Sequence, residues 1–138
     1  MIAADTSAIL AVVFAEPERD RFKRIMQRAG LVLVSTVSAL EARMVVHGRR
    51  GQRVVVLVDD LLRLPVFELV PPGVAEMEAA YSAFVTYGKG SGHPAALNFG
   101  DLFSYALAKI RGVPLLFKGD DFRQTDVPAA SGENDNEP

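Results

Sequence analysis

Five acidic residues lie where the sequence predicts strand ends or the first two turns of helices. Asp5 follows the apolar run "MIAA", and Asp120 and Asp121 follow "VPLLFKG" near the other end of the chain. Glu41 lies six residues past the apolar run "LVLVS", and Asp101 lies in the first turn of an expected helix. Carboxylates that converge repel one another unless a cation lies between them. Oxygen ligands favour a hard ion, so these acids could hold Mg²⁺ or Mn²⁺ and support phosphoryl chemistry.

Each acid also has a purely structural explanation. Asp5 could serve only as a helix N-cap, and Asp101 could form a capping box with Asn98. Glu41 by itself is typical of a surface helix residue, and an aspartate pair after a glycine is typical of a polar turn. The case for chemistry therefore depends on the joint placement of the acids.

The elements that would position these acids are short apolar strands that alternate with helices. We expect strands at 1–5, 31–35, 65–70 and 113–117. We expect helices at 6–16, 18–29, 36–47, 52–64, 74–87 and 99–111. In the helix at 74–87 the expected inner face carries Met77, Tyr81 and Phe84. This order predicts an α/β fold, a three-layer α/β/α sandwich with a central parallel sheet.

In an open parallel sheet, ligands bind beyond the carboxyl ends of the strands, where the strand order reverses. Asp5 ends the first expected strand, and Asp120 and Asp121 end the fourth. If these two strands are neighbours, the strand order alone brings their aspartates together.

Length and composition bound the class of protein. The chain has 138 residues and a net charge of −2, and we expect one domain at 1–128 followed by a disordered acidic tail at 129–138. It has no cysteine, which excludes a thiolate metal site and fits a reducing compartment. No apolar run reaches the ~18 residues of a membrane span. The first residues lack the basic region of a signal peptide. We therefore expect a cytoplasmic protein with no membrane partner.

Basic residues follow Glu41 on the same expected helix. They are Arg43, His47, Arg49, Arg50 and Arg53. One interpretation is a solvated helix end, where cations are favoured by the helix dipole. The other is a contact with the phosphate backbone of a nucleic acid, made chiefly by the last three arginines. The sequence leaves both open.

Four segments together resemble the PIN-domain superfamily, and within it the VapC-type ribonuclease toxins of bacterial toxin–antitoxin pairs. They are "DTSAILA", "STVSALEA", "GHPAALNFGDLFSYALA" and "LLFKGDDFRQTDV", in the order and near the spacing of that family. The resemblance implies a PIN-like sandwich and a Mg²⁺- or Mn²⁺-dependent endoribonuclease that hydrolyses RNA with a metal-activated water. It also implies a cognate antitoxin and a homodimer. A positive mean hydropathy and the uncharged run "VVVLV" also favour a symmetric dimer.

The resemblance also implies the site residues. Asp5, Glu41 and Asp101 match the acids of the family, and the fourth acid falls within "KGDDF". We assign the fourth position to Asp121, because related sequences usually keep the aspartate directly before phenylalanine. Asp120 is then expected to face solvent, paired with Lys118.

Two small hydroxyl residues beside the first aspartate, Thr6 and Ser7, match family positions that can bond a carboxylate or a metal-associated water. Capping of the helix explains them equally well. Two alternatives to a nuclease remain. One is a non-catalytic binding module, although all four acids are present. The other is a receiver-like phospho-acceptor domain, in which Lys118 would serve as the lysine after the last strand.

Overall fold

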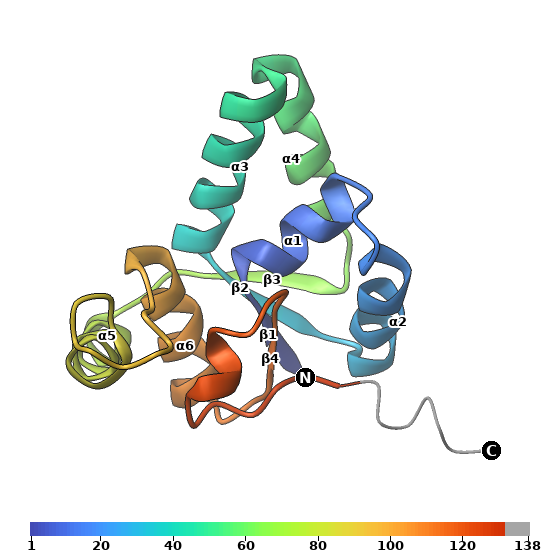
Figure 1. Ribbon diagram of the computed structural model, residues 1–138. Helices are drawn as coiled ribbons and strands as arrows, with labels where there is room; N and C mark the ends of the chain where they lie inside the picture. The colour runs from blue at the N-terminus through green and yellow to red at the C-terminus, as the bar shows by residue number, and fades with distance from the viewer. Residues whose placement is uncertain (132–138) are drawn as a thin grey trace.

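The computed structural model describes residues 1–131, which form a parallel sheet with helices on both faces (Figure 1). Within these residues the strands are β1 (Ile2–Ala4), β2 (Val32–Ser35), β3 (Phe67–Val70) and β4 (Leu115–Leu116). The strand order is β3-β2-β1-β4, and every pairing is parallel. The predicted three-layer α/β/α sandwich is therefore confirmed.

The helices connect the strands as crossovers. Within the described residues the α-helices are α1 (Thr6–Val13), α2 (Arg19–Ala29), α3 (Thr36–Arg50), α4 (Val56–Leu62), α5 (Val74–Tyr87) and α6 (Phe99–Arg111). Two short 3₁₀ helices are η1 (Gln52–Val55) and η2 (Phe122–Gln124). The valine-rich segment at 52–64 is helical as expected, with η1 leading into α4.

The strand order reverses at β1. The chain passes from β1 outward to β2 and β3, and then crosses back to place β4 on the other side of β1. Ala3 pairs with Leu115 and Ala4 with Leu116, so the carboxyl ends of β1 and β4 lie side by side. This is the neighbour relation that brings the aspartates at the two strand ends together.

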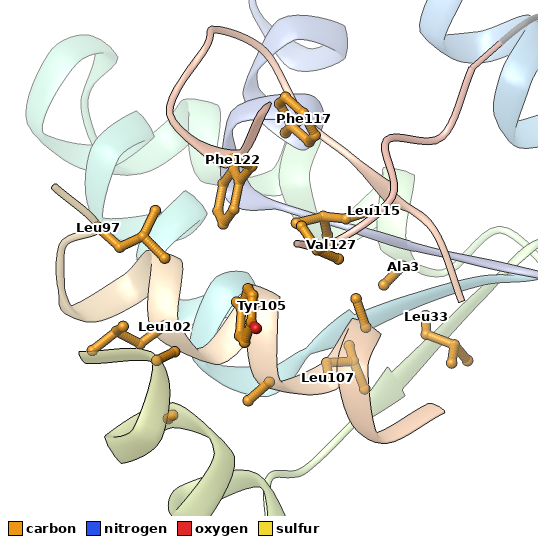
Figure 2. Close-up of a cluster of buried hydrophobic side chains, with 14 of the residues drawn as sticks. Ala3, Leu33, Leu97, Leu102, Tyr105, Leu107, Leu115, Phe117, Phe122 and Val127 are labelled. Atoms are coloured by element: carbon orange, nitrogen blue, oxygen red, sulfur yellow. The ribbon is translucent and has the colours of Figure 1, made fainter. Parts of the chain in front are cut away.

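Both faces of the sheet are buried, because alternate strand residues enter different cores. Ala3, Leu33 and Leu115 face α5 and α6, in the cluster that Figure 2 shows. Their neighbours Ile2 and Val32 face the opposite core, which α1, α2 and α4 cover. The same pattern explains why the strands are continuous apolar runs rather than alternating ones.

The prediction for the inner face of α5 is wrong. Met77, Tyr81 and Phe84 are exposed, whereas Ala80 and Ala83 are buried. The small alanines let α5 pack closely on α6, and the larger apolar side chains are left on the outside. The helix is apolar around most of its circumference, so its inner face could not be chosen by hydrophobicity.

The segment after β4 is fastened to α6 and to the sheet. The Tyr105 hydroxyl donates a hydrogen bond to Asp126, which also forms an ion pair with Lys109 at 3.0 Å. Ala129 and Ala130 pack against the cores, and the Ala130 N–H bonds the Leu115 carbonyl. The chain thus follows the edge of the sheet two residues past the predicted boundary at 128.

The rest of the predicted tail, 132–138, lies outside the described residues. Among the helices of residues 1–131, none combines the length and the apolar character that crossing a membrane requires.

We predict that Tyr105→Phe lowers the free energy of unfolding by about 1 kcal/mol, the usual net value of a hydrogen bond. The bond from Tyr105 is the main cause that lowers the pKa of Asp126. A lowered carboxyl pKa contributes stability at neutral pH that is lost as the pH falls through the folded-state value. Urea unfolding should therefore separate wild type from variant at pH 7 and bring them together in acid. Tyr81→Phe, the same change at an exposed site, should have no effect at either pH.

Candidate active site

The side chain of Asp5 is the most enclosed of the candidate acids. It is buried at the end of β1, and it caps α1 by accepting a hydrogen bond from the Ser7 N–H at 3.0 Å. The same oxygen, Oδ2, accepts the Ser7 hydroxyl at 2.7 Å, and Oδ1 accepts the Ser104 hydroxyl at 2.6 Å. The capping explanation is thus correct for Asp5, and it places the carboxylate at the carboxyl edge of the sheet.

Asp101 lies opposite, in the first turn of α6. It forms a reciprocal capping box with Asn98: its carboxylate accepts the Asn98 N–H at 3.0 Å, and its own N–H bonds the Asn98 side chain at 2.9 Å. This box uses one carboxylate oxygen, Oδ2. Here too the local structural role and the position at the candidate site coexist.

Glu41 comes from α3 and lies against the backbone of α6. A methyl group built on Gly100 would lie 2.7 Å from Glu41 Oε1 and closer still to Oε2. The carboxylate of Glu41 therefore occupies the space that the missing side chain leaves open, directly beside Asp101. A glycine at this position is what permits the two acids to be neighbours.

The electrostatics of Asp101 show that the four acids converge. Burial is the main cause that raises the pKa of Asp101 from its ordinary 3.8 to about 7. The Asn98 hydrogen bond opposes this shift, while the negative charges of Asp5, Glu41 and Asp121 add to it. These acids come from four different segments of the chain, so uncompensated negative charge gathers at the strand-order reversal.

The "KGDDF" loop separates its two aspartates. Asp121 is the one whose charge acts on Asp101, whereas the side chain of Asp120 is 89% exposed. Asp120 pairs loosely with Arg123 at 3.8 Å rather than with Lys118 as predicted. Phe122, which follows the two aspartates, anchors this loop, since its ring is buried against Phe117 (Figure 2).

The side chain of Lys118 does not pair with Asp120. Its ammonium group forms ion pairs with Glu16 at 3.3 Å and Glu18 at 3.2 Å, and its backbone N–H donates to the Ser7 hydroxyl at 3.0 Å. A receiver-like domain would need this lysine at the acidic site, so its pairing with the two glutamates speaks against that alternative.

The hydroxyl residues divide into two groups. Ser7 bonds Asp5 directly, as predicted, whereas Thr6 donates to the Ser38 carbonyl at 3.4 Å and touches none of the four acids through a hydrogen bond. Sequence reasoning missed Ser104 and its partner Ser38, whose Oγ atoms lie 3.1 Å apart. Ser104 lies three residues after Asp101, on the inner face of α6, and that spacing is the only signal that could have suggested it.

A divalent cation suits this donor set. The available ligands are carboxylate oxygens, which Mg²⁺ and Mn²⁺ prefer. A cation would also offset the repulsion from Asp5, Glu41 and Asp121, which adds to the effect of burial on the pKa of Asp101. Within residues 1–131, no group of three His, Cys, Asp or Glu side chains is already arranged to hold a metal ion. Binding of a cation would therefore require side chains to rotate. Of the four acids, Glu41 and Asp121 are the ones whose side chains form none of the hydrogen bonds described above.

The predicted RNA-binding arginines lie at the other end of α3 from the acids. The guanidinium groups of Arg49 and Arg50 each lie 5.4 Å from the centre of the Phe14 ring. Arg53 follows in η1 and is exposed. Eight residues separate Glu41 from Arg49, which is roughly 12 Å along a helix. Arg49 and Arg50 thus share α3 with Glu41 but lie well apart from it, and Arg53 lies beyond the helix in η1.

The family model of the PIN domain matches residues 2–128. Ribonuclease VapC30 of Mycobacterium tuberculosis (strain H37Rv) is 44% identical over 123 residues, which are 89% of this chain and 93% of that protein. The chain therefore belongs to the VapC ribonucleases of the PIN-domain family, and the resemblance found in the sequence is confirmed.

Solved structures agree with this fold. The crystal structure of Mycobacterium tuberculosis VapC20, a sarcin–ricin loop cleaving toxin, has a TM-score of 0.75 at 18% identity and covers 92% of this chain and 96% of its own. VapBC2 from Rickettsia felis, bound to a DNA fragment from its promoter, has a TM-score of 0.73 at 14% identity, with coverages of 94% and 96%. At such identities the likeness concerns the fold alone.

We predict that Asp101→Asn changes how the stability of the metal-free protein depends on pH. Because the pKa of Asp101 rises on folding from 3.8 to about 7, the folded state keeps a proton that the unfolded state releases. Stability should fall as the pH rises across that window. Thermal unfolding in the presence of a chelator should show this decline in wild type and in the exposed control Asp120→Asn. Asp101→Asn should flatten it and raise the midpoint at pH 7.5, and an unaltered decline would contradict the assignment.

Proposed function

We propose that this protein is a Mg²⁺- or Mn²⁺-dependent endoribonuclease and the toxin of a type II toxin–antitoxin pair. Membership of the VapC ribonucleases supports the class of activity. The observation that carries the metal-dependent chemistry is the gathering of four carboxylates at one edge of the sheet: burial raises the pKa of Asp101, and the charges of Asp5, Glu41 and Asp121 raise it further. Gathered carboxylates repel one another, but together they could bind the divalent cation that phosphodiester hydrolysis would use.

The roles follow from how each acid is held. Asp5, fixed by three hydrogen bonds, and Asp101, fixed by its capping box, are the ligands that would position a cation. Glu41 and Asp121 complete the cluster and would adjust to the cation or orient the attacking water. When bound, the cation neutralises the phosphate and lowers the pKa of an attacking water.

An antitoxin is the proposed protein partner. Beside the acids lies a groove of about 580 Å³, and the apolar side chains of Leu40, Met44 and Phe99 line it together with Glu41 and Gly100. These three apolar residues are exposed in the isolated chain. A partner segment that filled the groove would cover the rim of the acidic site. The structural neighbour from Rickettsia felis is a VapBC pair, which supports a partner of this kind.

A symmetric dimer is proposed on a second apolar surface, the outer face of α5. Its exposed residues recur at helical spacing and are Val74, Met77, Tyr81, Phe84 and Val85. The rings of Tyr81 and Phe84 stack with their centroids 6.5 Å apart. A helix that is apolar on its outer face is a common interface in homodimers, where two copies bury the same surface.

Arg49, Arg50 and Arg53 are proposed to contact the RNA backbone. Arg49 and Arg50 end α3 with their guanidinium groups over the ring of Phe14, and Arg53 follows in η1. An RNA strand that reached from the acidic cluster to these arginines would run along α3. Phosphate contacts of this kind add affinity without reading the RNA sequence.

The test of the proposed function compares two adjacent aspartates. Asp121→Asn should reduce RNA cleavage most at limiting Mn²⁺, because Asp121 belongs to the acidic cluster. Asp120→Asn, an identical change at the solvent-facing neighbour, should cleave like wild type. Asp5→Asn should abolish cleavage at any Mn²⁺ concentration. Labelled RNA incubated with purified protein, with and without Mn²⁺ and EDTA, gives the rates. Wild-type protein that leaves RNA intact, or Asp120→Asn that loses more activity than Asp121→Asn, would contradict the proposal.

We predict that Gly100→Ala reduces cleavage without unfolding the protein. The added methyl would force the Glu41 carboxylate out of its place beside Asp101. Gly100 lies in the first turn of α6, where alanine gains less over glycine than the up to about 1 kcal/mol of a helix interior, so the melting temperature should hold. Gly48→Ala is the matched control, since a methyl there meets no atom within 4 Å. It should keep at least wild-type stability and full activity, and equal activities of the two variants would count against this role of Gly100.

The dimer is tested by light scattering at micromolar concentration. Wild type should show twice the 14.9-kDa mass of the chain. Met77→Glu combined with Tyr81→Glu places charges on the outer face of α5 and should give a folded monomer. A monomeric wild type would refute the dimer, and a dimeric double variant would refute this surface.

A further inference from the structure

Two serines that are absent from the proposed ligand set form a hydroxyl pair behind Asp5. Ser38 on α3 and Ser104 on α6 are almost completely buried, with exposed fractions of 0% and 1%. Their Oγ atoms lie 3.1 Å apart, and Ser104 also bonds Asp5 Oδ1 at 2.6 Å. Three elements, β1, α3 and α6, thus meet through two hydroxyl groups.

The chemistry of the groups fixes the direction of these hydrogen bonds. An ionised carboxylate can only accept, so the Ser104 proton points to Asp5. The Ser104 oxygen is then free to accept, and the Ser38 hydroxyl must donate to it. The result is a chain of donors that runs from Ser38 through Ser104 to Asp5, with no alternative arrangement while Asp5 is ionised.

This chain decides which part of the Asp5 carboxylate remains available. Two carboxylate oxygens offer about four acceptor sites in all. Oδ2 accepts two hydrogen bonds, from the N–H and the hydroxyl of Ser7, and is therefore saturated. Oδ1 accepts one, from Ser104, and keeps one lone pair. Because the carboxylate is held from both sides, it cannot rotate to offer a different lone pair.

We propose that Ser104, oriented by Ser38, is a positioning residue that makes Asp5 a ligand through Oδ1 alone for a divalent cation. The inference rests on the metal-dependent part of the proposed function and does not depend on the identity of the substrate. Without the Ser104 hydroxyl, the two hydrogen bonds from Ser7 to Oδ2 remain, but no hydrogen bond holds Oδ1 in place. Its alignment toward Asp101 would then have to be established each time a cation binds.

The experiment measures Mn²⁺ binding by titration calorimetry on the purified full chain. Loss of a partner that orients a metal ligand typically weakens metal affinity by about 10–100-fold, and Ser104→Ala should show a loss in that range. Ser38→Ala should weaken Mn²⁺ only a few-fold, because Ser104 keeps its bond to Asp5. Ser35→Ala is the control. Ser35 is also a buried serine, but it caps α3 through the Val37 N–H, and its loss should lower stability while leaving Mn²⁺ affinity unchanged.

A second measurement separates positioning from general damage. In RNA cleavage, Ser104→Ala should need more Mn²⁺ for half-maximal rate and approach the wild-type rate at saturation, which a misfolded protein would not do. Wild-type Mn²⁺ affinity in Ser104→Ala would overturn the inference, as would a wild type that takes up no Mn²⁺. If Ser104→Ala does not fold, equal affinities of Ser38→Ala and wild type would overturn it. If wild type binds Mn²⁺ but leaves RNA intact, the nuclease proposal fails, whereas the loss of affinity in Ser104→Ala still supports this inference.

Discussion

The carboxylate of Asp5 is the interaction on which the remainder of the acidic edge depends. It caps α1 through Ser7, receives the Ser104 hydroxyl from α6, and is linked through the Ser7 hydroxyl to the backbone N–H of Lys118 after β4. One buried side chain therefore joins the first strand, the last helix and the loop that carries Asp121. Fold and site share these hydrogen bonds, so a change that disturbs one disturbs the other.

The second constraint is the cost of gathering like charges in a partly buried place. The protein offsets some of it with helix ends. Asp5 is the N-cap of α1 and Asp101 lies in the first turn of α6, where the partial positive charge of a helix N-terminus favours an anion. The offset is incomplete: burial raises the pKa of Asp101 to about 7, and the charges of Asp5, Glu41 and Asp121 still contribute to that rise. A bound cation would lower this remaining repulsion.

The sequence predicted those features that local patterns determine. Apolar strand runs gave the sheet, and acids at the ends of two strands gave the edge where a site would lie. The sequence could not predict features that depend on which surfaces meet. Ser104 resembles any other small helix residue until α6 packs against β1, and Gly100 gains its meaning only from the Glu41 carboxylate beside it. The inner face of α5 was mistaken for the same reason, because alanines decided the packing through their small size.

The loop after β4 carries three aspartates within seven residues, and their carboxylates would repel one another if they lay together. Each of the three lies in different surroundings, so this repulsion is avoided. Gly119, with φ of +97°, starts a turn that few other residues could make. The buried ring of Phe122 then fixes the turn. Both aspartates are exposed, and Asp121 is the one whose charge acts on Asp101. Asp126 is held on α6 by Tyr105 and Lys109, away from both. Adjacent acids are tolerated at this strand end because the turn directs them apart, and only one of the three adds to the charge of the site.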